Sequence, residues 1–298
     1  MPVSRWRPWL LLAAPLTVIG VLLLWPIVRV TILSFQQYGL REVIAGRPTF
    51  VGLDNFREVL TGDYLWSTVL PNTLIFAFVA VVGTIVLGTL VALLLQQLGT
   101  WGRVVVIGSA LVAWALPAVT GTYIWVWIFE PDTGIARKVF EGLGLIGPEG
   151  FNWFTERWSF YSIAAINVIH HSYPFVAITI FAGLSTVPEE LHEAAKLDGA
   201  SAWRRFWSIT VPIMRPVFAV VTILSTIWDF KVFAQIYLMP GGDGGNEEIF
   251  NLGVWSYITA MTKTDYGLGS AIAVLLTAVL LVITVLYIRA LFREDDLQ

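Results

Sequence analysis

One polar stretch between apolar segments decides how the chain folds: Glu193-Ala194-Ala195-Lys196-Leu197-Asp198-Gly199, followed by Ile209-Thr210-Val211-Pro212. Pro188 fits the first position of a helix that runs into this stretch. Gly199 is expected to end that helix, and Ser201 is expected to cap a second one over about residues 202–209. The sequence therefore predicts a short helix–turn–helix over about residues 188–212.

The rest of the chain is strongly apolar. Hydrophobic residues make up 57% of the sequence and charged residues only 13%, with a mean hydropathy of +0.75. Six segments are long enough to cross about 30 Å of hydrocarbon, and backbone groups in lipid are satisfied within helices. We expect an all-α polytopic membrane protein that forms one transmembrane domain over residues 1–298. The six spans are placed near Trp9–Val28, Thr73–Leu95, Val104–Phe129, Phe160–Leu184, Val217–Leu238 and Leu268–Ile288.

An even number of spans puts both termini on one side of the membrane. Arg5 and Arg7 precede the first span, and Arg289 and Arg293 follow the last. Basic residues in short segments next to spans favour the cytoplasmic side. Both termini, and with them the polar loop at 188–212, are therefore expected in the cytoplasm.

Several functions are excluded by what the sequence lacks. With no cysteine, disulfides and thiolate chemistry are impossible, and three histidines make a metal site improbable. No Gly-Lys dipeptide occurs, so there is no phosphate-binding loop for ATP and the chain is not expected to be an enzyme. Gly142, Gly144 and Gly147 spell G-x-G-x-x-G, but no strand precedes them. The sequence contains no basic patch of the kind that would indicate nucleic-acid binding.

The polar loop resembles the EAA loop of ABC importer permeases. Six positions match the family spacing, and Val211 replaces the usual Leu; the matching residues are Glu193, Ala194, Ala195, Gly199, Ile209 and Pro212. Three further stretches are similar to sugar-type permeases of the maltose and glycerol-phosphate branch: Gly52–Phe56, Asn72-Thr73 and Tyr266–Ala271. The glycine cluster after the fifth span is also similar, although Asp243 departs from the usual Gly-Gly-Pro.

This resemblance implies the type I ABC importer permease fold, a single permease domain and a set of partners. The loop is expected to dock into an ATPase subunit through Glu193, Ala194, Ala195, Asp198, Gly199, Ile209 and Pro212. The implied partners are a second permease, two cytoplasmic ATPase subunits that bind ATP and Mg, and an extracytoplasmic binding protein. This chain itself is expected to hold no cofactor. The implied location is the bacterial cytoplasmic (inner) membrane.

The resemblance also implies where substrate passes. Positions that hold sugar in the maltose branch carry over to Val168, His171, Ser172 and Phe175 in the fourth span, and to Leu224, Ile227, Trp228 and Lys231 in the fifth. Each set has the spacing of one helix face. Aromatic rings there can stack on a pyranose, while the polar side chains can hydrogen-bond hydroxyls. The expected substrate-pathway residues are His171, Ser172, Phe175, Ile227, Trp228 and Lys231, with ordinary helix packing as the alternative for His171 and Trp228.

Several alternatives stay open at this point. A carbohydrate, in the first place a disaccharide or short oligosaccharide, is the favoured substrate, and glycerol-3-phosphate or a related phosphodiester is second because Lys231 can serve a phosphate. Asp229 either pairs with the second permease or makes a plain polar contact, and His170 is expected to pack against a neighbour. An ion-coupled secondary transporter needs repeats or paired intramembrane carboxylates, and Asp229 is the one acid placed within a span. A membrane enzyme would have to use His170, His171 and Asp229, which nothing orders into a known reaction.

Overall fold

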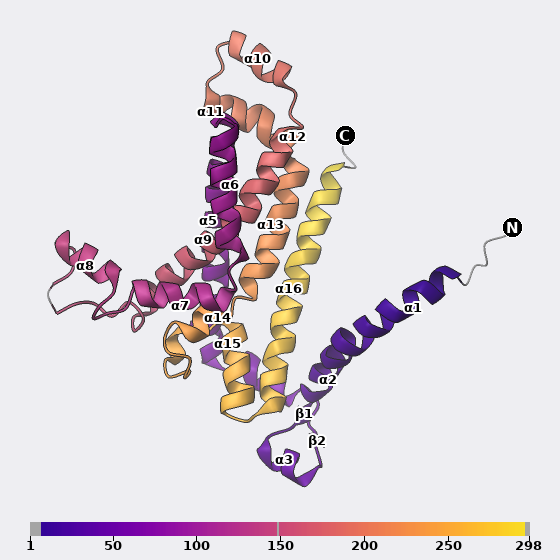
Figure 1. The fold of residues 1–298 in the computed structure, drawn as a ribbon. Helices are drawn as coiled ribbons and strands as arrows, with labels where there is room; N and C mark the ends of the chain where they lie inside the picture. The colour runs from indigo at the N-terminus through magenta and orange to yellow at the C-terminus, as the bar shows by residue number, and fades with distance from the viewer. Residues whose placement is uncertain (1–6, 148, 296–298) are drawn as a thin grey trace. The chain divides into compact units, whose positions relative to one another are not determined.

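The computed structural model describes residues 7–147 and 149–295, and helices dominate it (Figure 1). Arg5, used above for the topology, lies outside the described residues. The contacts divide the chain into two compact units: one joins Met1–Ser67 with Leu252–Val279, and the other joins Thr68–Asn251 with Leu280–Gln298. The single permease domain expected over residues 1–298 stays a prediction.

The larger unit is built around two long helices that pack side by side, α5 (Leu70–Gln97) and α9 (Arg157–Leu184). Glycine on α5 allows their close approach, because a Cβ at Gly88 would lie only 2.6 Å from a methyl carbon of Val176. Small residues at such contacts are typical of helices that associate in membranes. The other elements of this unit are α6 (Thr100–Ala115), α7 (Ala118–Ile128), α8 (Ile135–Gly142), α10 (Glu189–Leu197), α11 (Ala202–Arg205), α12 (Val211–Ile213), α13 (Arg215–Phe230) and α14 (Ala234–Leu238).

A buried apolar cluster joins α5, α9 and α13 near one end of these helices. Its members are Ala92, Val176, Ile180, Leu184, Met214 and Val221. Near the other end, the Asn72 side chain donates hydrogen bonds to the carbonyl oxygens of Glu248 (2.9 Å) and Phe250 (2.8 Å). The Tyr161 hydroxyl donates to the carbonyl between them, that of Ile249, at 2.8 Å. Buried polar groups thus hold the segment that follows α14.

The smaller unit begins with α1 (Arg7–Ile19) and α2 (Trp25–Leu33), which a π-type turn over Gly20–Leu24 joins into one helix. Two short antiparallel strands, β1 (Gln36–Gln37) and β2 (Thr49–Phe50), follow. The Asn55 side chain donates to the carbonyls of Ser34 (2.9 Å) and Gln36 (3.0 Å), which fixes this segment. The other helices are α3 (Leu40–Ala45), α4 (Asp54–Thr61), α15 (Leu252–Tyr257) and the first part of α16 (Tyr266–Asp295).

The predicted membrane spans are found, with one change of shape. Within the described residues, five helical segments are long and apolar enough to cross a membrane: Leu12–Leu33, Leu65–Gln97, Arg157–Leu184, Arg215–Leu238 and Tyr266–Arg289. The straight span expected over Val104–Phe129 is instead a pair, α6 and α7, bent by 99°. The cause is Pro117, which drives Leu116 before it into an extended conformation with ψ 133°. Six spans result when the bent pair is counted as one.

Candidate functional site

The turn of the polar loop has the geometry that its sequence predicts. Helix α10 ends at Leu197, and Gly199 adopts a left-handed conformation with φ +78°. The Gly199 amide donates to the Lys196 carbonyl (3.1 Å), and the Ala200 amide donates to the Ala195 carbonyl (2.9 Å). This pair of hydrogen bonds is a Schellman motif, in which glycine is preferred because it carries no Cβ.

The second helix of the loop begins where expected and runs further than expected. Ser201 caps it, since its hydroxyl accepts a hydrogen bond from the Arg204 amide at 3.3 Å. The helix continues past residue 209 through a π-type turn to Ile213. Pro188 was expected inside the first helix, but its extended conformation (ψ 129°) places it just before α10. The expectation of a helix–turn–helix is therefore correct in kind, with both boundaries shifted.

The loop is fixed at its base and exposed at its tip. Met214, directly after α12, is 1% exposed and belongs to the buried cluster, while Thr210 is buried and lies 3.5 Å from the His192 ring. In Figure 1, α10 and α11 extend beyond one end of the helices α5, α9 and α13. The loop is thus anchored at its base to the helices α5, α9 and α13.

Large apolar side chains are exposed along this loop. Leu197 is 90% exposed and Trp203 is 72% exposed, and Leu191 and Trp207 are also exposed. Apolar surface of this kind marks an interaction site. Of the residues predicted for coupling, Glu193, Ala194, Asp198, Gly199 and Pro212 are exposed, whereas Ala195 and Ile209 are half-buried.

A cavity of about 490 Å³ lies at the far end of α13 from the loop. Four of the six residues predicted for the substrate pathway line it, namely His171, Ser172, Trp228 and Lys231, together with Val168. His170, next to His171, lies against Trp125 with 5.9 Å between ring centroids, as its place on the helix predicts. The remaining lining comes from Trp114, Ala118, Asp229, Val232, Phe233, Ala234 and Gln235.

The other two predicted residues stand behind the cavity wall. Phe175 lies between two tryptophans, with 5.0 Å between its ring centroid and that of Trp228 and 6.3 Å to that of Trp114. Ile227 is half-buried on α13 and does not line the cavity. The three rings form an aromatic wall in which Phe175 supports Trp228.

Sequence reasoning missed the helix break that shapes this cavity. The fifth span was expected to be continuous, but α13 stops at Phe230 and α14 starts at Ala234. Neither Pro nor Gly lies in the break. The buried Asn251 side chain donates to the Val232 carbonyl at 2.8 Å and so satisfies a backbone group that the helix no longer pairs. Trp114 and Gln235 were missed too, because they reach the cavity from other helices.

One acidic and one basic residue line the cavity in different surroundings. Asp229 is only 2% exposed, and its Oδ2 atom has no hydrogen-bond partner within the described chain. Lys231 is exposed and stands at the end of α13. Among the described residues the two form no ion pair.

Helices α9 and α13 both join the loop to the cavity, because α9 ends at Leu184, just before the loop, and carries His171 and Ser172 in the cavity lining. Helix α13 begins at Arg215, directly after the buried Met214, and its last turn carries Trp228 and Asp229 into the cavity. Its 16 residues correspond to about 24 Å. The loop and the cavity thus lie at opposite ends of α13.

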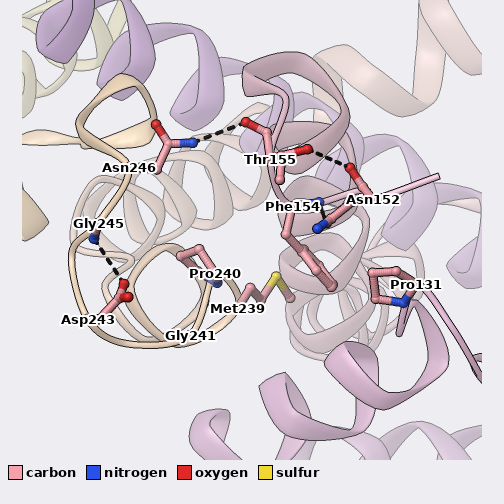
Figure 2. A pocket seen from close by; sticks show the side chains of 10 residues that line it. All are labelled: Pro131, Asn152, Phe154, Thr155, Met239, Pro240, Gly241, Asp243, Gly245 and Asn246. Carbon is pink, nitrogen blue, oxygen red and sulfur yellow. Dashed lines mark hydrogen bonds between the residues drawn. The ribbon is translucent and has the colours of Figure 1, made fainter.

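A second cavity, of about 400 Å³, lies between the segment before α9 and the glycine-rich segment after α14 (Figure 2). The Asn246 side chain donates to the Thr155 carbonyl at 3.1 Å and ties the two segments together. The Gly245 amide donates to the Asp243 carboxylate at 2.9 Å, so Asp243 stabilises the turn in which the expected Gly-Gly-Pro is missing.

Residues 84–294 match the family of binding-protein-dependent transport system inner membrane components. Over 289 residues the chain is 38% identical to the diacetylchitobiose uptake system permease protein DasB of Streptomyces coelicolor, with 97% of this chain and 88% of the relative covered. It is 33% identical to the trehalose/maltose transport system permease protein MalF of Thermococcus litoralis, with 96% and 94% covered.

Solved structures show the same fold. A chain of a bacterial ABC transporter that imports the acidic polysaccharide alginate superposes with a TM-score of 0.80, covering 96% of both chains at 21% sequence identity. The same transporter in complex with a periplasmic protein bound to an alginate pentasaccharide gives a TM-score of 0.77 at 20% identity. The expected ABC importer permease fold is therefore confirmed.

Proposed function

We propose that this chain, which belongs to the family of binding-protein-dependent transport system inner membrane components, is one permease subunit of an ABC importer for a carbohydrate. One observation carries this proposal. An exposed helix–turn–helix is joined through α13 to a cavity walled by aromatic and polar side chains. Helix α13 thus follows directly on the loop and also lines the cavity.

The loop couples the chain to ATP hydrolysis. Its exposed apolar side chains, Leu197, Trp203 and Trp207, enter a cleft of an ATPase subunit, and Glu193 makes a charged contact at the rim. Two ATPase subunits bind ATP and Mg, while this chain holds no cofactor and hydrolyses nothing. Their closure displaces the loop, α13 carries the displacement to the cavity, and access alternates between the two sides of the membrane.

The cavity receives the sugar. The Trp228 ring stacks on the apolar face of a pyranose, and His171, Ser172 and Lys231 hydrogen-bond its hydroxyls. A disaccharide or short oligosaccharide is the favoured substrate, which agrees with relatives named for diacetylchitobiose and for trehalose and maltose. Lys231 also suits a phosphate, so glycerol-3-phosphate is the second candidate.

The complete importer contains a second permease that pairs with this chain and an extracytoplasmic binding protein that delivers the sugar. The chain lies in the bacterial cytoplasmic membrane with both termini in the cytoplasm. Under this topology the loop faces the ATPase subunits, and the cavity shown in Figure 2 faces the binding protein.

The test is ATP hydrolysis by the reconstituted importer, assembled with its binding protein and screened with diacetylchitobiose, trehalose, maltose and glycerol-3-phosphate. We expect one of the neutral sugars to stimulate turnover, and Gly199→Val to abolish the stimulation. Stimulation by glycerol-3-phosphate alone would replace the carbohydrate assignment by the second candidate. Turnover that never depends on a binding protein would contradict the importer assignment itself.

A further inference from the structure

A third cavity, of about 80 Å³, lies beside the 490 Å³ cavity, and the two share the lining residues Ala118, His171 and Gln235. Its walls come from α6, α7, α9 and α14. About 10–15 Å³ is enough to hold one water molecule, so this cavity has room for a group of several atoms. Of the proposed sugar contacts only His171 borders it, so these contacts leave the cavity itself unused.

Two buried amide side chains line this cavity without a partner. Asn167 on α9 is 3% exposed and Gln235 on α14 is 6% exposed. Within the described chain neither side-chain amide makes a hydrogen bond, and neither belongs to the unpaired polar atoms that lie out of reach of water. Both amides are therefore accessible to a molecule in the cavity. Because buried polar groups are as a rule hydrogen-bonded, two unpaired amides on one cavity point to a ligand.

The cavity has a polar side and an apolar side. His170 and His171 stand with the two amides on the polar side, whereas Leu116, Ile124 and Trp125 are apolar. The described residues contribute no Asp, Glu, Lys or Arg to the lining. A buried water needs about two to four polar partners, which the apolar side does not offer. The cavity thus suits an uncharged group that is polar at one end and hydrocarbon at the other.

We propose that the 80 Å³ cavity binds the acetamido group of an N-acetylated sugar whose ring lies in the 490 Å³ cavity. This inference rests on the proposed function and narrows it. Each side-chain amide offers N–H donors and a carbonyl acceptor, so Asn167 and Gln235 pair with the C=O and N–H groups of the acetamido group. Its methyl group then packs against the apolar side and is removed from water.

The residues shared by the two cavities bring such a substituent to the right place. His171 and Gln235 line both, so a ring that is hydrogen-bonded to His171 has a neighbouring substituent beside Gln235. A sugar with a hydroxyl at the same ring carbon lacks the acetyl group. It leaves the two amides unpaired, and a site built to hydrogen-bond a group discriminates strongly against an analogue without it.

The experiment compares diacetylchitobiose with cellobiose, which carries hydroxyls in place of the two acetamido groups. Binding of each sugar to the whole importer in lipid nanodiscs is measured by saturation-transfer NMR without the binding protein, so the membrane part alone is probed. Gln235→Met and Asn167→Leu remove the amides at nearly constant size. The matched control is Ser225→Ala, because the Ser225 hydroxyl is also buried and unpaired in the described chain but lies out of reach of water and lines neither cavity.

We expect the parent to bind diacetylchitobiose at least about tenfold more tightly than cellobiose, with the strongest saturation on the acetamido methyl protons. Gln235→Met and Asn167→Leu should each weaken diacetylchitobiose binding about tenfold and leave cellobiose binding within about twofold. A merely structural role for the amides would change the binding of both sugars alike. Ser225→Ala should leave both affinities within about twofold of the parent.

Four results overturn this inference. They are equal binding of the two sugars by the parent, an unchanged preference in both amide variants, the strongest saturation on hydroxymethyl instead of acetamido protons, and no binding of diacetylchitobiose to the membrane part. Uptake by proteoliposomes with the binding protein then separates this failure from that of the proposed function. Uptake of another carbohydrate leaves the proposed function intact, whereas uptake of no carbohydrate contradicts it as well.

Discussion

The polar loop over residues 188–212, which we propose couples to the ATPase, and the 490 Å³ cavity, which we propose binds substrate, are built in different ways, although α13 connects them. In the loop, each structural feature comes from neighbouring residues: Gly199 makes the turn and Ser201 caps the next helix. In the cavity, the wall needs Trp114 from a distant helix, and the helix break needs Asn251. The mechanical part is thus encoded locally, whereas the recognition part depends on tertiary contacts.

This difference has a functional consequence. A locally encoded loop can keep one shape and fit the same kind of ATPase cleft. A cavity assembled from five helices can change its lining one residue at a time. Variants in the loop should therefore affect transport of every sugar equally, whereas variants in the cavity should change which sugar is preferred.

The largest effect is expected where the loop joins the helices. Met214→Ala removes a side chain that is 1% exposed in the buried cluster, and should destabilise the protein by about 2–5 kcal/mol. The thermal unfolding of the purified complex measures this. Ile213→Ala is the control, because Ile213 is 38% exposed and should cost much less. Equal losses would show that the loop is not anchored through Met214.

The next effect concerns the helix break beside the cavity. Asn251→Leu removes the donor to the Val232 carbonyl and should cost about 1–3 kcal/mol, since that oxygen loses its partner. Asn246→Leu is the matched control, because Asn246 also donates to a distant carbonyl but is only half-buried. Unfolding and sugar preference are both measured. An unchanged sugar preference in Asn251→Leu would mean that the break does not shape the cavity.

Two tryptophans separate recognition from coupling. Trp228→Ala should raise the sugar concentration needed for half-maximal uptake about tenfold, because an aromatic wall is lost. Trp203→Ala, in the exposed loop, should lower the maximal rate for all sugars without changing their order of preference. A raised half-maximal concentration in Trp203→Ala, together with a lowered maximal rate for all sugars in Trp228→Ala, would contradict the roles given to the loop and the cavity.

A smaller effect is expected from the helix cap in the loop. Ser201→Ala removes the acceptor for the Arg204 amide and should cost about 1 kcal/mol of local stability. Hydrogen exchange across residues 201–205 measures it, with the exposed Ser208→Ala as the control. Faster exchange in both variants alike would show that Ser201 does not cap the helix.

The division between local and tertiary encoding also separates much of what the sequence predicted from what it missed. The spans depend on hydropathy, and the turn depends on Gly199, a residue without a Cβ. Both could therefore be predicted from the sequence. The 99° bend had a local signal in the sequence, because Pro117 favours an extended conformation at Leu116. The continuous hydropathy around this pair predicted a straight span instead. The break after Phe230 had no local signal, because a hydrogen bond from Asn251 stabilises it. Pattern could place His171 and Trp228 on a common surface, but it could not supply Trp114 or Gln235.

We propose that displacement of the loop reaches the cavity only when the turn of the loop keeps its geometry. Variants at Gly199 test this proposal. A side chain added there meets no atom of this chain within 4 Å, so within the chain its effect comes from the φ of +78°. Valine is strained in this conformation by about 1–2 kcal/mol, whereas asparagine tolerates it. Sugar-stimulated ATP hydrolysis by the reconstituted importer is the measurement. We predict that Gly199→Val loses the stimulation and that Gly199→Asn keeps most of it. Full stimulation in Gly199→Val, or equal loss in both variants, would contradict the account.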